Sequence, residues 1–591
     1  MGPGIPTLSA MPTPADQISP PPGVAMSADA PSGPPKDAAV IVAGGGPVGM
    51  TLALDLAERG VDVLVLEQSA TTTDNPRCNT TNARSMEYYR RLGIAEAIRR
   101  AGLPLDHPSD VVYTTSLLGW ELARFRFSSS GDVLAGTAPE FDEWATPEPQ
   151  HRVSQIYLEP IIEEAVARQP RARVLRSHRV ESVTQYDDHV AVTARQLLSD
   201  GTPGEQVTFR ADYLAGCDGG ASVVRKAIGA VLEGDPRVAE QRVSVYFRSP
   251  RLHELLNQRR PGWMYWWYGP TWRGSFVQLD GRELFLCHSR VPVGMDPESV
   301  DPDEVLEAAI GQPVDHEKIQ VVRWDPRRLV ANHFHDRRVM LAGDAAHLWL
   351  PLGGFGMNTG IADAMGLSWR IAANVQGWGG PRLFEDYETE RRSVGEATSR
   401  AALKIDSDMT KIGRDGELHA ETERGAELRA AAGELIELID KKQWYSQGVQ
   451  FGARYFDSRG IAVDESTDRG GEAAIGEIDV YVPSVTPGSR LPHYWRPDGT
   501  SVFDALGPAW TLLRIGQRPP TCERLVEAAR RRRVPLLVLD LPEEQAVATY
   551  KRAAVLTRPD MFVAWSGDAE PADFETVLDE LLGLDAEASP A

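Results

Sequence analysis

The stretch from Asp37 to Ser69, DAAVIVAGGGPVGMTLALDLAERGVDVLVLEQS, constrains the fold of this chain more than any other. An apolar run suited to a strand buried on both faces leads into three glycines with GxGxxG spacing, Gly44, Gly46 and Gly49. A helical segment follows and stops at a glycine, and a second apolar run ends at Glu67. This order predicts a strand–helix–strand unit that binds a dinucleotide.

The loop residues have separate physical tasks. Gly44 permits the tight turn, Gly46 lets backbone N–H groups approach a pyrophosphate, and Gly49 lets the helix pack on the strand. The helix N-terminus then faces the diphosphate, and Glu67 is placed to accept hydrogen bonds from a ribose. We expect the cofactor to contact Gly44, Gly46, Pro47, Val48, Gly49, Glu67 and Gln68. The motif alone does not distinguish FAD from NAD.

The overall composition excludes several classes of protein. A length of 591 residues predicts about three or four domains. The net charge of -22 argues against a nucleic-acid partner, which needs a basic footprint. The four cysteines form no CxxC pair and no metal spacing with histidine, so we expect no metal site, no disulfide framework and a cytoplasmic location.

Two segments near the N-terminus need separate interpretations. Residues 1–36 are rich in Pro, Ala and Ser, which indicates a disordered tail. Residues 38–54 are uncharged and approach the length of a membrane span. The clustered glycines and Pro47 interrupt this stretch, so we expect strand, turn and helix there and no membrane span.

Two more glycine turns follow predicted strands later in the chain. YLAGCDGGASVVRKAIG turns at Asp218 and Gly219. A strand at residues 339–342 turns at Gly343 and Asp344, and a glycine-rich loop then leads into a helix. We expect this helix from about Asn358 to Gln376, with Asn358 or Thr359 as its cap.

With these three turns in this order, the sequence from residue 37 onwards resembles the FAD-dependent aromatic hydroxylases of the para-hydroxybenzoate hydroxylase type. Its later region resembles the larger branch of phenol and aromatic-polyketide hydroxylases. The resemblance implies FAD and an α/β fold with a Rossmann-like FAD domain, an inserted antiparallel β-sheet substrate domain and a C-terminal thioredoxin-like domain. The expected segments are FAD domain 37–105, 151–235 and 333–400; substrate domain 106–150 and 236–332; a helical region and linker 401–477; and thioredoxin-like domain 478–591.

The resemblance also implies roles for single residues. Asp344 would hold the ribityl chain of FAD. Arg77 would lie near the ribityl chain and the diphosphate, in a segment that the family links to flavin movement. Asp218 and Gly219 would lie near the diphosphate, and Gln155 would contact the flavin.

The glycine-rich loop would serve the flavin ring. Backbone N–H groups at a helix start stabilise negative charge, as carried by a reduced flavin. Pro351 would shape the reactive face, so Pro351 and Arg77 are the residues that we expect to act in catalysis. The other loop contacts implied are Gly354, Gly356, Met357 and Asn358. His347 is expected to be a packed histidine.

Between the second and third turns lies a segment rich in aromatic residues and punctuated by turns, which predicts an antiparallel sheet. In the family such a sheet floors the substrate pocket. For any single one of these aromatic residues, a place in the core of the sheet is favoured over a place in the pocket wall. The candidate lining residues are Trp263, Tyr265, Trp267, Phe276 and Gln278.

The C-terminal segment lacks the redox motif of a thioredoxin. Cys522 stands in PPTCERL, and Leu525 occupies the position of a second thiol. Dithiol chemistry is therefore excluded here. We expect a structural role or a contact within a homodimer.

The resemblance implies a two-part reaction. NADPH or NADH would reduce FAD, and the reduced flavin with O2 would form a C4a-hydroperoxide that hydroxylates a phenolic or polycyclic, polyketide-like aromatic. Baeyer–Villiger oxygenation on the same scaffold is the main alternative. Weaker alternatives are a flavin halogenase, whose WxWxIP segment is lacking, and a binding protein of the prenylation-chaperone kind. The sequence identifies no catalytic base.

Overall fold

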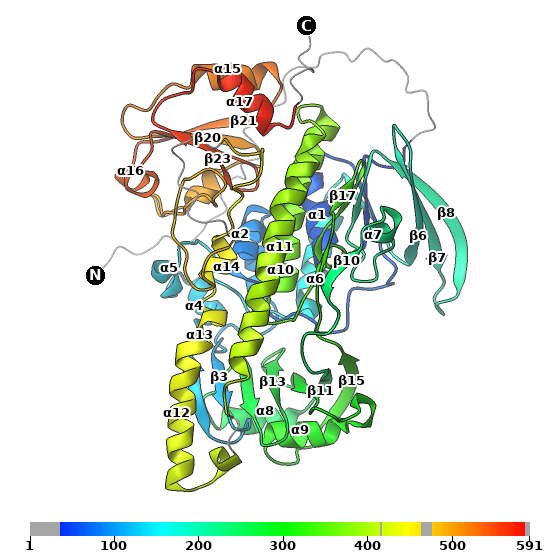
Figure 1. Ribbon diagram of the computed structural model, residues 1–591, viewed down its shortest axis with the longest axis vertical. Coiled ribbons are helices and arrows are strands. Elements are labelled where there is room, and N and C mark those ends of the chain that lie inside the picture. Colours follow the sequence, from blue (N-terminus) through cyan, green and yellow to red (C-terminus); the bar gives the residue numbers. More distant parts are fainter. Residues whose placement is uncertain (1–35, 414–415, 463–474, 585–591) are drawn as a thin grey trace.

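The computed structural model describes residues 36–413, 416–462 and 475–584 (Figure 1). The predicted tail at 1–36, apart from its last residue, lies outside the described residues, as does much of the predicted linker. The predicted domain boundaries stay a prediction. The described chain nevertheless divides into three bodies: a central sheet with its helices, a second large sheet below it and a C-terminal sheet above it in Figure 1.

A six-stranded sheet forms the centre, in the order β17-β18-β9-β1-β2-β5. Its strands are β1 (Val40–Ala43), β2 (Val63–Leu66), β5 (Ala172–Leu175), β9 (Tyr213–Gly216), β17 (His335–Asp336) and β18 (Val339–Leu341). β1 pairs in parallel with β2 and β9, and β9 pairs in parallel with β18. The carboxyl ends of β1, β9 and β18 therefore meet at one edge, although they come from distant parts of the chain.

The helices of the central body follow from its apolar segments. The main ones are α1 (Pro47–Glu58), α6 (Gln155–Ala167), α10 (Phe355–Gln376) and α11 (Arg382–Met409). α1 contacts α10 and α6, while α11 descends from beside the C-terminal body to the lower sheet in Figure 1. Shorter helices are α2 (Ala83–Arg91), α3 (Ala95–Arg99), α4 (Ser130–Leu134), α5 (Glu140–Glu143), α7 (Val223–Ala227), α13 (Lys441–Trp444) and α14 (Gln447–Phe451).

Two small antiparallel sheets flank the central one. The first, at the right of Figure 1, contains β6 (His178–Gln185), β7 (Val190–Leu197) and β8 (Pro203–Ala211). The second contains β10 (Leu232–Asp235), β16 (Arg328–Ala331) and β19 (His347–Leu348). β19 leads into the loop before α10, so this small sheet holds one end of that loop.

A seven-stranded sheet forms the lower body, in the order β15-β11-β14-β13-β12-β3-β4. Its strands are β3 (Val111–Thr114), β4 (Glu121–Phe125), β11 (Arg242–Arg248), β12 (Met264–Tyr268), β13 (Arg273–Gln278), β14 (Leu284–Arg290) and β15 (Glu317–Trp324). The sheet is antiparallel as predicted, except that β12 and β3 pair in parallel. These two strands are far apart in the chain, so the turn residues beside each strand do not predict that they pair.

The two faces of this sheet pack against different partners. On the outer face lie α8 (Pro250–Asn257) and α9 (Pro302–Ile310), which contribute Leu252, Leu256, Val305 and Leu306 to one apolar cluster. On the inner face lie the end of α11 and α12 (Glu423–Ile439), together with Leu350, Leu352 and Phe355. The inner face is therefore the one that meets the loop before α10.

The C-terminal body contains a four-stranded sheet in the order β21-β20-β22-β23. Its elements are β20 (Trp510–Ile515), α15 (Glu523–Arg531), β21 (Leu536–Leu541), α16 (Glu544–Tyr550), β22 (Ala554–Thr557), β23 (Val563–Gly567) and α17 (Phe574–Leu581). Cys522 caps α15 and is buried, and burial raises the pKa of its thiol to about 11. A thiol with that pKa stays protonated, in line with a structural role.

Buried ion pairs fasten this body to the central one. Arg490 and Arg84 both contact the carboxylate of Glu87. Arg558 donates to Glu390 and to Asp560, at 2.6 Å in each case. Removing one partner of such a buried pair typically costs about 3–5 kcal/mol, so the contact between the bodies is sensitive to single substitutions.

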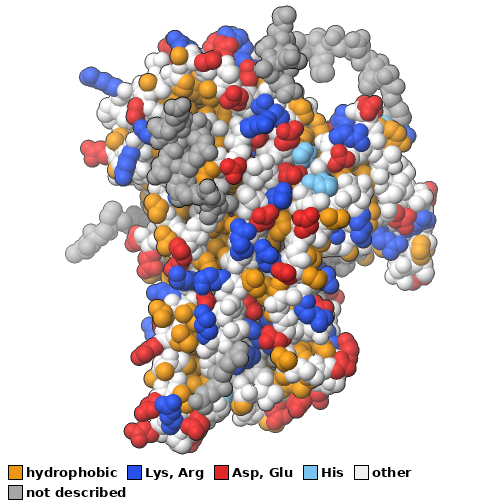
Figure 2. Space-filling model, in the orientation of Figure 1, with side chains coloured by type: hydrophobic (Ala, Val, Ile, Leu, Met, Phe, Trp, Pro, Cys, Tyr) orange, Lys and Arg blue, Asp and Glu red, His pale blue; other side chains and the backbone are white. Residues whose placement is uncertain are grey.

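The surface carries both signs of charge. Figure 2 shows acidic and basic side chains interspersed over the visible face, without a basic stripe of the kind that tracks a nucleic-acid backbone. No helix in the described parts of the chain combines the length and apolar character needed to cross a bilayer.

Candidate active site

Three glycine turns meet at the shared edge of β1, β9 and β18. Gly44 has φ +102°, and a Cβ there would lie 2.3 Å from the carbonyl oxygen of Cys217, which precedes the second turn. A Cβ at Gly49 would lie 2.0 Å from the carbonyl oxygen of Gly44. Only glycine fits at these two positions, because the facing atoms are backbone and cannot move aside.

The third turn packs on the first turn of α1. Cβ atoms at Gly343 and Gly360 would lie 3.0 Å and 2.6 Å from side-chain carbons of Val48. By contrast, a Cβ at Gly46 would meet no atom within 4 Å. Gly46 caps α1 without a side-chain hydrogen bond, and Pro47 follows it. The start of α1 therefore presents free backbone N–H groups to open space.

The acidic end of β2 faces the same loop. The carboxylate of Glu67 accepts hydrogen bonds from the backbone N–H of Gly45 at 2.5 Å and of Ser69 at 2.7 Å. Gln68 beside it is exposed. Glu67 and Gln68 therefore lie beside the first glycine turn, where the sequence predicts that the ribose of the cofactor binds.

α10 begins at Phe355, three residues earlier than the sequence predicts. Its cap is Gly354, with φ +67°, and neither Asn358 nor Thr359 caps it. The sequence prediction was wrong because it searched for a polar side chain, whereas a left-handed glycine turns the chain here. Gly356, Met357 and Asn358 consequently lie in the first turn, where backbone N–H groups have no partner within the helix.

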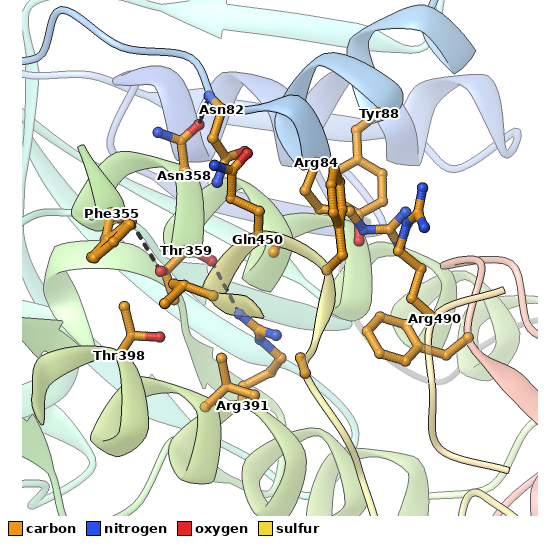
Figure 3. Close-up of a pocket in the computed structure, with 16 residues that line it drawn as sticks. Asn82, Arg84, Tyr88, Phe355, Asn358, Thr359, Arg391, Thr398, Gln450 and Arg490 are labelled. Atoms are coloured by element: carbon orange, nitrogen blue, oxygen red, sulfur yellow. Dashed lines mark hydrogen bonds between the residues drawn. The ribbon is translucent and has the colours of Figure 1, made fainter. Parts of the chain in front are cut away.

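The side chain of Asn358 fastens this helix start to a distant segment. Its amide donates to the carbonyl oxygens of Thr80 at 2.9 Å and Gly354 at 2.6 Å. Its oxygen accepts from the backbone N–H of Asn82 at 2.9 Å, and Figure 3 shows the two asparagines side by side. Asn358 thus positions the loop through its side chain, in addition to any use of its backbone.

Asp344 and Arg77 are both exposed. Partial removal of water by the surrounding protein still raises the pKa of the Asp344 carboxyl, and the charges of His347 and Arg77 oppose this. Pro351 is also exposed, in the loop between β19 and α10. His347 stacks on Trp349 at 4.6 Å and bonds to Asp363 at 2.7 Å, as expected of a packed histidine.

Two other predicted contacts have partners within the protein. Asp218 accepts from the N–H groups of Val223 at 2.7 Å and Val224 at 3.2 Å, so its carboxylate caps α7. Gly219 follows with φ +76°. The N–H of Gln155 donates to the carbonyl oxygen of Cys78 at 2.7 Å, which places the start of α6 against the segment that contains Arg77.

The structure separates the predicted lining residues into two groups. Trp263 joins the inner-face cluster, and Gln278 is buried, with its amide donating to Gly262 at 2.6 Å. Tyr265, Trp267 and Phe276 lie on the outer face among the side chains of α8 and α9. Their assignment as pocket lining is corrected, because side chains alternate along a strand and these three point away from the loop. On β12 the inward positions belong to Met264, Trp266 and Tyr268.

Sequence reasoning missed an acid on the inner face. Asp440, at the end of α12, accepts a short hydrogen bond from the hydroxyl of Tyr113, whose oxygen accepts from Trp444 Nε1 at 2.7 Å. Burial raises the pKa of Asp440 to about 7. No sequence pattern marks this group, because its members come from β3 and from a helix end more than 300 residues away.

A second missed residue is Arg152, which is 2% exposed. Its Nη1 donates to the hydroxyl of Thr80 at 3.1 Å, and its guanidinium lies 4.4 Å from the ring centre of Trp263. Arg152 stands three residues before Gln155 in the segment HRVSQ, so the motif that drew attention to Gln155 also contained it.

Two protein families match separate parts of the chain. An FAD-binding domain family matches residues 37–402, and a family described as the C-terminal domain of aromatic-ring hydroxylases matches residues 484–584. The chain belongs to the FAD-dependent aromatic monooxygenases. The family, the fold class and the cofactor that the sequence predicted are thereby confirmed.

Similar proteins cover this monooxygenase almost end to end. The FAD-dependent monooxygenase apdD of Emericella nidulans is 31% identical over 93% of this chain and 90% of its own. The structure of chromopyrrolic acid-soaked RebC with bound 7-carboxy-K252c is 35% identical, with a TM-score of 0.83, over 93% of this chain and 100% of its own. A ternary complex of aklavinone-11 hydroxylase with FAD and aklavinone is 28% identical, with a TM-score of 0.76, over 93% and 99%.

The residues of this monooxygenase fit FAD. Along one edge of the central sheet lie the open space in front of Gly46, the free N–H groups at the start of α1 and the start of α10, which has no side-chain cap. FAD, with NAD(P)H as reductant and O2 as co-substrate, supplies the redox chemistry. What the protein contributes is position, charge and exclusion of water.

A separate cavity of about 40 Å³ lies between α2, α10, α11, α14 and the C-terminal body (Figure 3). Arg84 and Arg490 in its wall both contact Glu87, and Arg391 contacts Asp363. The volume holds little more than water. It is therefore no place for an aromatic substrate.

Proposed function

We propose that this monooxygenase hydroxylates a bulky phenolic aromatic held between the inner face of the seven-stranded sheet and the loop before α10. One observation carries the proposal: the inner-face cluster contains Trp263, Trp266 and Tyr268 from the sheet together with Leu350 and Leu352 from that loop. An apolar floor under the loop would hold an aromatic ring where water is excluded. Relatives that bind 7-carboxy-K252c or aklavinone support a bulky substrate.

For the cofactor, we propose three contact regions along the edge of the central sheet. The first turn with Glu67 and Gln68 would hold the adenosine and diphosphate, helped by Asp218 and Gly219. Asp344, Arg77 and Gln155 would hold the ribityl chain and adjoining groups. The loop with Pro351, Gly354, Gly356, Met357 and Asn358 would border the flavin ring, its N–H groups facing the ring's negative charge in the reduced state.

Hydroxylation is favoured over Baeyer–Villiger oxygenation by the pair of Asp440 and Tyr113. A phenol has a pKa near ~10 and becomes a good electron donor only when it loses its proton. The Tyr113 oxygen would accept this proton as Tyr113 passes its own to Asp440, whose pKa of about 7 suits a base at neutral pH. Baeyer–Villiger chemistry on a ketone has no need of this acceptor.

The test is a screen of NADPH oxidation by the yellow holoenzyme with phenols of one, two and three rings. We expect stimulation by the larger phenols, and a product whose mass rises by one oxygen with the ring carbon skeleton intact. An ester or lactone product would establish the Baeyer–Villiger alternative. A protein that purifies without flavin would contradict the whole proposal.

Two properties of the protein in the cell complete the proposal. The free state of all four cysteines supports a reducing compartment, the cytoplasm. A homodimer is the assembly that the family resemblance implied. Light scattering coupled to size-exclusion chromatography would measure twice the chain mass of 64.8 kDa for a dimer.

A further inference from the structure

Arg152 is a buried cation that forms no ion pair with any described residue, although the buried carboxylate of Glu140 acts on it at longer range. Its Nε and Nη2 have no hydrogen-bond partner in the described part of the chain, and no carboxylate of that part forms an ion pair with it. Burial lowers the pKa of Arg152 to about 9, and the charges of Glu140 and Tyr445 oppose this only in part. The guanidinium is therefore still charged at neutral pH, in a place where an unpaired charge is costly.

Four other buried arginines of this chain differ from Arg152, because each of them forms an ion pair. Arg370, Arg490 and Arg558 are buried as deeply, and each pairs with a carboxylate: Glu390, Glu87 and Glu390 respectively. Arg391, 3% exposed, pairs with Asp363. These four guanidinium groups thus have a carboxylate in direct contact, whereas Arg152 has none among the described residues, and Arg225, which is also without an ion pair, donates instead to two backbone carbonyls.

The surroundings of Arg152 locate the missing anion. The guanidinium lies 4.4 Å from the ring centre of Trp263, 5.2 Å from that of Phe127 and 5.5 Å from that of Trp444, all three in the inner-face cluster. On its other side Nη1 donates to Thr80, and a Cβ at Gly354 would lie 2.9 Å from Thr80 Cβ. Arg152 is therefore between the proposed substrate floor and the cap of α10.

The two orphaned nitrogens also indicate the shape of the anion. Nε and Nη2 lie on one side of the guanidinium and together form a fork that matches the two oxygens of a carboxylate. The same chain uses this fork at Arg514, whose Nε and Nη2 donate to the two oxygens of Asp540 at 2.6 Å and 2.8 Å. The bond from Nη1 to Thr80 leaves the fork of Arg152 free and fixes its orientation.

We propose that Arg152 is a specificity-determining residue that binds a carboxylate on the aromatic substrate through Nε and Nη2, and so selects aromatic acids over neutral phenols. This assignment rests on the proposed function, since it places the anion on the substrate of that reaction. The rings of Trp263, Phe127 and Trp444 enclose the pair and keep water from it. With the carboxylate at this point, the substrate ring would extend over the inner face.

The test compares 1-hydroxy-2-naphthoate with 1-hydroxy-2-naphthamide, which share the rings and the phenol and differ in charge. Kd is measured on oxidised holoenzyme by perturbation of flavin absorbance, without turnover. The wild-type protein should bind the acid about tenfold or more tightly than the amide. R152Q should weaken binding of the acid about 10- to 100-fold and of the amide less than about threefold.

R152K should fall in between, because an ammonium supplies the charge without the fork. The matched control is R429Q: Arg429 stacks on Trp120 at 4.2 Å, and its Nη1 donates to two backbone carbonyls. It should leave the ratio of the two Kd values unchanged. FAD content and thermal unfolding of each variant would show that the fold is intact.

Several outcomes would overturn the proposal. They are a wild-type protein that binds the acid no better than the amide, equal weakening of both probes in R152Q, and no weakening of either. A shift in the flavin reduction potential of R152Q with the acid preference intact would mean that reduced flavin is the counter-ion. Selective binding of the acid without any oxygenated product would instead refute the proposed function and leave the anion site standing.

Discussion

The cofactor edge of the central sheet and the inner face of the seven-stranded sheet differ in how their polar groups are satisfied. At the cofactor edge, the side chains of Asn358, Asp218 and Glu67 have hydrogen-bond partners in the protein. On the inner face, Arg152 Nε, Trp266 Nε1 and the Tyr268 hydroxyl have none among the described residues. For these six side chains the contrast agrees with our proposal of a preformed cofactor cradle beside a surface that its substrate completes, since buried polar atoms are nearly always partnered.

The largest effect should come from the proton acceptor of the inner face. D440N keeps the size of the side chain and removes the base, so the rate of substrate hydroxylation should fall about 10²- to 10⁴-fold. FAD content should stay unchanged, because Asp440 is remote from the glycine turns. In the wild-type protein the rate should rise with pH through about 7, as Asp440 loses its proton, and D440N should lack this rise. A pH–rate profile that D440N leaves unaltered would break the assignment.

The same substitution has a predicted effect on stability. The folded-state pKa of Asp440, about 7, is raised above the ordinary 3.8. Its contribution to stability is therefore fully present below about pH 4 and is lost as pH rises through 7, at a cost of up to about 4 kcal/mol. Chemical unfolding at pH 5 and pH 8.5 should show that D440N gains stability relative to the wild-type protein at the higher pH. A constant difference would contradict the raised pKa.

A smaller effect separates two glycines of the cofactor edge. G49A places a methyl group against the carbonyl of Gly44 and should lower the free energy of unfolding by about 1–3 kcal/mol. G46A meets open space and should leave the stability of the flavin-free protein unchanged, while weakening FAD at least about tenfold. Calorimetry on flavin-free protein and FAD titration measure the two quantities. Equal loss of stability in both variants would mean that the methyl group of G46A meets protein atoms, and that the space before Gly46 is not a binding site for FAD.

The smallest effect compares adjacent tryptophans on opposite faces of the sheet. Trp266 and Trp267 are both buried, and neither indole N–H has a partner among the described residues. W266F should raise the Kd of a bound phenol about fivefold, because it removes a donor from the inner face. W267F acts on the outer face and should leave that Kd within about twofold. A larger effect of W267F than of W266F would mean that the substrate binds on the outer face of the sheet, which would contradict our proposal.

The two regions also differ in how far the sequence predicted them. The glycine turns were predictable because backbone crowding at Gly44 and Gly49 admits no other residue, and such a requirement is local. The start of α10 was misplaced by three residues, because the left-handed cap at Gly354 follows from its close approach to Thr80. That contact joins segments far apart in the chain.

The inner face was predictable only in outline. Aromatic alternation predicted a sheet, but it did not tell which of Trp266 and Trp267 points inward, since both residues suit either face. Arg152 became visible only once the fold placed it near Trp444, and Asp440 only once the fold placed it against Tyr113. Their importance lies in unusual surroundings, which a sequence pattern does not record.

The central claim is that three separated turns hold one FAD along a single sheet edge, and D344A tests it most directly. Asp344 is exposed, and no hydrogen bond or ion pair joins its side chain to another described residue, so the variant should fold as the wild-type protein does. We predict that D344A purifies with little or no flavin, measured as the ratio of flavin to protein absorbance, and that added FAD restores it only weakly. A D344A protein with full flavin occupancy would contradict the account.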